Sequence, residues 1–206
     1  MPLARIPKVA EVLYPGGVFR IPGKEKKTVY LTFDDGPIPE ATPIVLDILK
    51  QHNVKATFFC VGENVQKNPQ LFNRITNEGH SFGNHTFNHM DGWKNSVNEY
   101  ADNTKLCAGV VKSSLFRPPY GRITLKQFRK LKKEYKMVFW DVLSMDYDRE
   151  YSAEDCLLLI KKYTRPGSII VFHDSLKTKD KIAELLAKSI DFLKAERYDL
   201  EAIPMA

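Results

Sequence analysis

Two adjacent carboxylates follow an apolar run near the start of the chain. Residues 32–37 read Thr-Phe-Asp-Asp-Gly-Pro, directly after Val29, Tyr30 and Leu31. Acids placed together at the end of a buried strand repel each other and lose solvation, so this pair needs a chemical reason. One acid can hold a metal ion while the other takes a proton from water that the metal activates. Without such chemistry, Asp-Asp-Gly-Pro is typical of a turn.

Two histidines, His85 and His89, lie four residues apart. On a helical turn, residues at this spacing have Cβ atoms about 5–6 Å apart, so both imidazoles could bind one metal ion. Two neutral nitrogens and one carboxylate form a recurrent ligand set for catalytic zinc and leave a position for water. The same spacing also occurs on surface helices that bind no metal. The sequence therefore gives the two histidines and one of the two acids as candidate ligands.

Further polar residues follow other apolar runs. They are the stretch from Arg117 to Tyr120, the acids Asp141 and Asp146, and the pair His173 and Asp174. Each has a structural explanation on its own: an arginine in an ordinary salt bridge, or a histidine that caps a buried strand. Because all of them fall at successive predicted strand ends, we interpret them together as one active site.

Segments with the patterns of strands and helices alternate along the chain. Apolar runs predict strands over residues 28–33, 55–61, 81–83, 115–117, 137–142, 168–172 and 200–203. Apolar residues at helical spacing predict helices around residues 44–49, 71–75 and 100–110, and over 124–134, 153–163 and 180–195. Strands that are continuously apolar and alternate with helices indicate a parallel sheet covered by helices.

The predicted fold class is therefore α/β, and a barrel and an open doubly wound sheet both satisfy the pattern. No Gly-x-Gly-x-x-Gly follows the first strand, which disfavours a dinucleotide-binding open sheet. We predict a deformed or incomplete (β/α)7–8 barrel of parallel strands as the catalytic domain over residues 28–206, after an arm over residues 1–27. In such a barrel the active site gathers at the carboxyl ends of the strands.

Composition narrows the range of functions. The formal charge is +6 over 206 residues, but Lys and Arg are scattered among acids, which disfavours nucleic acid as a partner. The widely spaced Cys60, Cys107 and Cys156 predict buried thiols rather than disulfides or a thiolate zinc site. No stretch resembles a signal peptide or approaches the roughly 18 apolar residues of a membrane span. We expect no transmembrane segment, no obligate protein partner and a cytoplasmic location by default, with association with the cell envelope left open.

The ordered motifs resemble those of the polysaccharide deacetylases of carbohydrate esterase family four, also called the NodB homology family. The resemblance extends from about residue 28 to residue 203 and depends on five separated motifs in the same order. It implies a deformed (β/α) barrel, one divalent metal ion with zinc as the expected metal, and an acetylated glycan as substrate. It also implies that Asp34 is the catalytic base and that Asp35 binds the metal with His85 and His89.

The later motifs carry further implied roles. By the resemblance, Arg117 orients the base and the backbone N–H of Tyr120 helps to bind the oxyanion. The last motif is Ile170-Val-Phe-His173, in which His173 is implied to be the catalytic acid and Ile170 a substrate contact. Asp146 is implied to hold the acid histidine.

The fourth motif departs from the family, which has Asp-Trp where this chain has Asp146 and Tyr147. The family's tryptophan walls the acetyl pocket. Tyr147 keeps a flat apolar wall there but changes its width and adds a hydroxyl. Asp141 and Asp148 also compete with Asp146 for the role of partner to the histidine.

The resulting functional hypothesis is metal-dependent hydrolysis of N-acetyl groups on a glycan that contains N-acetylglucosamine, such as peptidoglycan or a chitin-like polymer. An O-acetyl esterase of the xylan type satisfies the same motifs, because only the leaving group differs. Two further hypotheses are a non-catalytic glycan-binding barrel and a peripheral structural protein of the wall or membrane.

Overall fold

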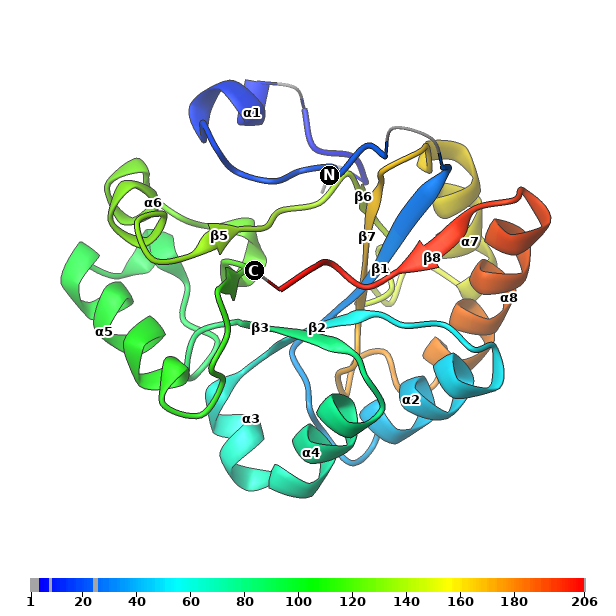
Figure 1. Ribbon diagram of the computed structural model, residues 1–206, viewed down its shortest axis with the longest axis horizontal. Coiled ribbons are helices and arrows are strands. Elements are labelled where there is room, and N and C mark those ends of the chain that lie inside the picture. Colours follow the sequence, from blue (N-terminus) through cyan, green and yellow to red (C-terminus); the bar gives the residue numbers. More distant parts are fainter. Residues whose placement is uncertain (1–3, 8, 24–25, 206) are drawn as a thin grey trace.

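A curled sheet of eight strands forms the centre of the molecule, and the predicted α/β class is confirmed (Figure 1). The computed structural model describes residues 4–7, 9–23 and 26–205. The strand order is β5-β4-β3-β2-β1-β7-β6, with β8 also paired to β1, and these pairings are all parallel. The strands are β1 Thr28–Asp34, β2 Thr57–Cys60, β3 Ser81–Asn84, β4 Leu115–Phe116, β5 Lys136–Met137, β6 Val142–Leu143, β7 Ile169–His173 and β8 Asp199–Glu201.

Helices follow most of the strands and surround the sheet (Figure 1). They are α1 Val9–Leu13, α2 Thr42–Gln51, α3 Gly62–Lys67, α4 Pro69–Asn77, α5 Val97–Ala108, α6 Leu125–Leu131, α7 Ala153–Tyr163 and α8 Ile182–Ala195, with short 3-10 helices η1 Gly92–Lys94 and η2 Pro119–Gly121. Side chains of Ser96, Thr124 and Ser152 cap α5, α6 and α7 in reciprocal capping boxes. Each box pairs free N–H groups at a helix start, so these boundaries are specified locally.

Strand β1 is buried along its whole length, as expected for a strand covered on both faces. Val29, Leu31 and Phe33 belong to the main core cluster, which also contains apolar residues of α2, α7 and α8. Since side chains alternate along a strand, Thr32 and Asp34 lie on the opposite face, inside the curl of the sheet. The apolar pattern of β1 therefore decides that Asp34 faces inward.

The strand predicted over residues 137–142 is wrong in detail, because the structure has two short strands there, β5 and β6, at opposite edges of the sheet. The chain crosses between these edges at residues 138–141. Part of the predicted N-terminal arm lies along the same region: the backbone N–H of Phe139 donates to Val18 O, and that of Leu143 donates to Ala4 O. The strands β5 and β6 do not pair with each other, and carbonyl groups of the arm accept hydrogen bonds from the chain in this region instead.

Cys60, Cys107 and Cys156 are buried and free, which confirms the prediction of buried thiols. Among the residues that the structure describes, no helix combines the length and the apolar character needed to cross a bilayer.

Candidate active site

The register of the sheet brings the predicted motifs to one end of the molecule. Asp34, the last residue of β1, is paired with His173 at the end of β7. Asn84, just before His85, is paired with Phe116, just before Arg117. Because the strands are parallel, their carboxyl ends share one edge, and side chains from β1, β3, β4 and β7 meet there.

Asp35, His85 and His89 form a compact cluster of candidate metal ligands. One ligand atom from each lies within 4.8 Å of the other two. The Asp35 carboxylate is 3.0 Å from His89 Nε2 and 3.8 Å from His85 Nε2. Ligands about 2.0–2.1 Å from a tetrahedral zinc ion are roughly 3.3 Å apart, which lies between these two distances. The donor set and its spacing therefore fit one divalent ion.

The two histidines do not lie on a helical turn, as their spacing had suggested. Residues 85–89 form an irregular loop in which Thr86 and His89 have positive φ angles of 62° and 57°. Asn84 holds this loop: its side-chain oxygen accepts the Thr86 N–H, and its side-chain nitrogen donates to Thr104 O in α5. The imidazole centroids of His85 and His89 are 5.1 Å apart, so the loop achieves the convergence that a helix would have given.

The protonation states of His85 and Asp35 suit metal binding. Nδ1 of His85 is 2.8 Å from the Arg117 carbonyl oxygen, which can only accept, so the proton is on Nδ1 and Nε2 has a free lone pair. Burial lowers the pKa of His85 to about 4, which keeps the ring neutral. Burial opposes ionisation of Asp35, but its contact with His89 and the charge of His173 hold the pKa of Asp35 well below its usual range, so the carboxylate is anionic.

The Asp34 carboxylate is oriented by a fully buried arginine. Arg117 Nη1 donates to Asp34 Oδ1 at 2.7 Å and to Thr32 Oγ1 at 2.8 Å, while Nη2 donates to Phe139 O at 2.9 Å. The guanidinium carbon also lies 4.1 Å from the centre of the Phe59 ring. These contacts fix Oδ1. For Oδ2 of Asp34 the described part of the chain provides no hydrogen-bond donor.

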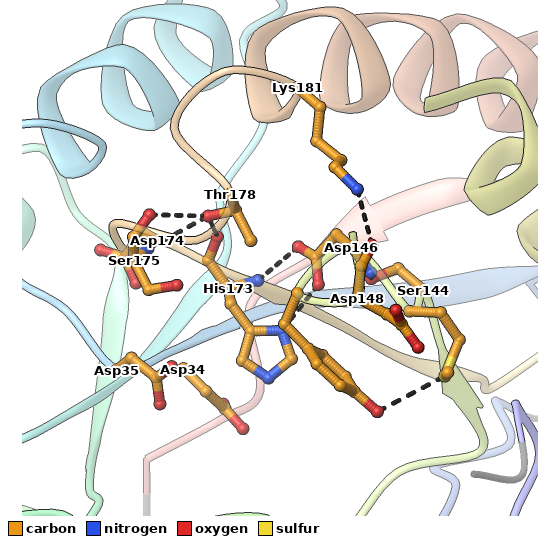
Figure 2. A network of polar contacts seen from close by, with 12 residues as sticks. Asp34, Asp35, Ser144, Asp146, Asp148, His173, Asp174, Ser175, Thr178 and Lys181 are labelled. Carbon is orange, nitrogen blue, oxygen red and sulfur yellow. Dashed lines mark hydrogen bonds and ion pairs between the residues drawn. The ribbon is translucent and has the colours of Figure 1, made fainter. Parts of the chain in front are cut away.

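His173 is held by Asp146, as Figure 2 shows. Asp146 Oδ1 lies 2.7 Å from His173 Nδ1, and Oδ2 accepts the His173 backbone N–H at 2.8 Å. Burial would lower the pKa of His173, but the Asp146 carboxylate outweighs it and raises the pKa to about 9. The imidazole is therefore protonated at neutral pH. It lies between Asp146 and the pair Asp34 and Asp35 (Figure 2).

The two competing acids, Asp141 and Asp148, lie elsewhere. Asp141 pairs with Arg165 and Ser168 Oγ, near the start of β7. The Asp148 side chain accepts the backbone N–H of Glu150. Neither carboxylate holds His173.

Tyr120 and Tyr147 border the site from two sides. The Tyr120 ring packs edge-on against His89 with centroids 4.5 Å apart, and its φ of 59° aims the backbone into a sharp turn after two prolines. No acceptor for the Tyr120 N–H is present in the described residues. The Tyr147 ring lies 5.1 Å from the His173 ring, and its hydroxyl donates to the Met145 sulfur at 3.5 Å. This contact directs the hydroxyl away from His173.

Ile170, like Asp141, is a predicted site residue that the structure does not bring to this place. Its side chain is fully buried in the main core cluster with Leu31 and Phe33. The reason is strand alternation: Ile170 and His173 are three apart in β7 and lie on opposite faces. Val171 shares the face of His173 and packs with Leu143 and Met145. No contact between the Ile170 side chain and a substrate is available in this arrangement.

Asp174 is a buried acid that the sequence pattern grouped with the site without giving it a specific role. Its Oδ1 accepts the Gly36 N–H at 3.2 Å, and its Oδ2 lies against the Thr42 hydroxyl. A Cβ on Gly36 would come within 2.0 Å of this carboxyl, so the turn that follows Asp35 requires glycine. Burial, with the charge of Asp35, raises the pKa of Asp174 to about 8. The tertiary contacts with Gly36 and Thr42 reveal what the residue does: it holds the turn that follows Asp35.

Known proteins share both the sequence and the fold. The family described as polysaccharide deacetylase matches residues 22–140. A peptidoglycan-N-acetylglucosamine deacetylase of Bacillus cereus is 40% identical over 158 residues, which cover 73% of this chain but only 57% of that protein. A second Bacillus cereus protein of the same name is 36% identical over 187 residues, or 87% of each chain.

A solved structure is similar to this chain in both fold and sequence. The crystal structure of the Bc1960 peptidoglycan N-acetylglucosamine deacetylase matches with a TM-score of 0.86 and 35% identity, over 95% of this chain and 94% of that one. Matches of this extent and identity show the family rather than the fold alone. The chain therefore belongs to the polysaccharide deacetylase family of hydrolases.

Proposed function

We propose that the chain hydrolyses N-acetyl groups of a glycan that contains N-acetylglucosamine, with one divalent metal ion bound by Asp35, His85 and His89. The observation that carries this proposal is the pairing of Asp34 with His173 across β1 and β7, beside the ligand cluster. A base and an acid thus flank the place where a metal would hold the reacting group. The names of the relatives from Bacillus cereus support N-acetylglucosamine as the sugar.

A bound divalent ion would supply Lewis-acid activation of water and of the acetyl carbonyl. The residues of the chain do the rest. Arg117 holds Asp34 Oδ1, which leaves Oδ2 to accept the proton of the attacking water. The Tyr120 N–H donates to the oxyanion as the carbonyl becomes tetrahedral, an interaction commonly worth about 3–4 kcal/mol in the barrier.

His173 then donates its Nε2 proton to the departing nitrogen. Amines leave poorly without a proton, so the amide C–N bond breaks only with such an acid in place. Asp146 stabilises the protonated ring through Nδ1, which points the Nε2–H toward the reacting group. The products are acetate and the free amino sugar.

The direct test is acetate release from oligomers of N-acetylglucosamine by the purified protein, measured before and after chelation and with added zinc. Release that disappears with chelation and returns with zinc supports the proposal. The same assay on acetylated xylan distinguishes an O-acetyl esterase. A protein that binds the metal and the glycan but releases no acetate from either substrate would be the non-catalytic barrel.

A further inference from the structure

A row of side chains leads from the metal-ligand cluster onto the surface. The Tyr120 ring contacts His89 with a centroid separation of 4.5 Å. The Arg122 guanidinium carbon lies 5.5 Å from the centre of the Tyr120 ring and 5.2 Å from that of Trp93. We call Tyr120, Arg122 and Trp93 the aromatic platform. It is continuous with the candidate active site through His89.

The two rings of the platform are unusually open to solvent. Trp93 is 63% exposed and Tyr120 is 59% exposed. Among the exposed large hydrophobic side chains of the described residues, these are the only aromatic ones, and both lie at this one place. Large aromatic rings contribute most to binding when a ligand covers them.

The platform is also held in position by the surrounding loops. Asp91 accepts the Trp93 backbone N–H at 3.0 Å and pairs with Arg122 at 2.7 Å. Gln127 of α6 donates to the Gly92 carbonyl at 2.8 Å, and a Cβ on Gly92 would lie 2.4 Å from the Arg122 carbonyl oxygen. A surface that is already ordered loses little conformational entropy when it binds.

The chemistry of the platform selects a class of ligand. An aromatic ring packs well against the C–H face of a pyranose, and a guanidinium donates to hydroxyl and acetamide oxygens. The charge of Arg122 is balanced by Asp91, which disfavours selection of an anionic ligand. We infer that the aromatic platform is a subsite for a neutral pyranose ring of the glycan, adjacent to the sugar that carries the reacting acetyl group. This inference rests on the proposed function for the identity of the polymer.

Steady-state kinetics on the dimer and the tetramer of N-acetylglucosamine tests the subsite. Trp93→Ala should lower kcat/KM for the tetramer by about three- to tenfold, mainly through KM, and by less for the dimer. Leu158→Ala, which removes a 54% exposed apolar side chain on α7, is the control and should change neither value. Equal losses of Trp93→Ala on both substrates, or no loss on the tetramer, would overturn the inference.

Fluorescence separates this inference from the proposed function. The chain has two tryptophans, Trp93 and Trp140, so titration with the tetramer should change the emission of the wild type and much less that of Trp93→Phe. This measurement needs no turnover, so a wild type without acetate release would refute the catalysis while the titration still decides the subsite. An unchanged emission, or binding that weakens steeply with salt as for an anionic ligand, would refute the neutral sugar subsite.

Discussion

Two buried aspartates, Asp34 and Asp141, have the same exposure of 5% and each pairs with an arginine at 2.7 Å. They differ in how many of their carboxylate oxygens accept a hydrogen bond. Asp141 uses both oxygens, because Arg165 donates to Oδ1 and Oδ2 and Ser168 donates to Oδ2. Asp34 uses only Oδ1 within the described residues. A carboxylate with both oxygens satisfied stabilises the fold, whereas one with a free oxygen can still take a proton.

The same contrast extends to the neighbours of each aspartate. Beside Asp34, His85 keeps a free Nε2 and Tyr120 keeps a free backbone N–H within the described residues. Beside Asp141, a second arginine, Arg5, has its Nε 3.6 Å from Asp141 Oδ1, but both carboxylate oxygens already accept hydrogen bonds from other residues. The surroundings of Asp34 thus keep unpaired donors and acceptors, whereas those of Asp141 are paired within the described residues.

The largest effect is expected from His85→Ala, which removes a metal ligand. Two remaining ligands hold a divalent ion poorly, so both bound metal and acetate release should fall to background. Elemental analysis of the purified variant measures the first and the acetate assay the second. His52→Ala, on a histidine outside the cluster, should retain both. Full metal content in His85→Ala would contradict the ligand assignment.

Asp34→Asn should keep the metal and lose about 10²–10⁴-fold in kcat, because the amide cannot accept the proton. Arg117 would also lose its charged partner, so the variant's thermal unfolding must be measured beside the kinetics. Asp141→Asn is the matched control and should retain kcat. Comparable activity losses in the two variants would remove the distinction between the two aspartates.

Asp146→Asn should shift the pH dependence. His173 acts as an acid only when protonated, and its raised pKa of about 9 keeps it so through neutral pH. Without the Asp146 charge, burial lowers the pKa of His173, so the basic limb of kcat against pH should move to lower pH. A divalent ion held by Asp35 would lower the pKa of His173 in the wild type and in Asp146→Asn alike. An unmoved basic limb would exclude His173 as the group that titrates.

Asp141→Asn should lower the free energy of unfolding by about 1–3 kcal/mol, because Arg165 loses its charge partner. The loss is limited because the Arg165 side chain is 34% exposed and water can solvate its charge. Burial opposes the charge of Asp141, but Arg165 and Ser168 lower the pKa of Asp141. Its stabilisation is therefore present above the unfolded pKa of about 4 and is lost as the pH falls. Denaturant unfolding at pH 7 and pH 3 should show the difference from the wild type shrinking at the lower pH.

The smallest effect is expected from Arg5→Ala. The Arg5 side chain is 39% exposed and 3.6 Å from Asp141, and such pairs are commonly worth less than about 1 kcal/mol. Denaturant unfolding in low and in high salt should give nearly equal values for this variant and the wild type. A loss as large as that of Asp141→Asn would show that Arg5 is essential to the pair.

Apolar patterning predicted much of the fold. The buried runs of β1 and β7 were recognisable as strands, and the other strands of the sheet pair outward from these two. The helix pattern failed for α1 and α3, which have five and six residues and are too short for a period to appear. It also failed at residues 137–142, where a continuous apolar run covers two edge strands and the crossing between them. Periodicity reports burial, and a buried crossing looks the same as a buried strand.

The residue types of the site were predictable, but their detailed placement was not. The convergence of His85 and His89 depends on a loop with positive φ angles that Asn84 and α5 hold, and spacing alone suggested a helical turn. Ile170 was placed by its position in a motif, whereas strand alternation turns it into the core. Asp174 and Thr42 join across 132 residues of sequence, which no local pattern reveals.

The hydrogen bonds that Val18 accepts from Phe139 of the crossing and that Ala4 accepts from Leu143 of β6 have a practical consequence. Motif boundaries suggest that a shortened protein could begin at residue 28. Such a truncation would leave two edge strands with open backbone groups, and exposed edges pair readily with other chains. The shortened protein should therefore self-associate and aggregate on concentration, although every residue of the proposed catalytic machinery would still be present.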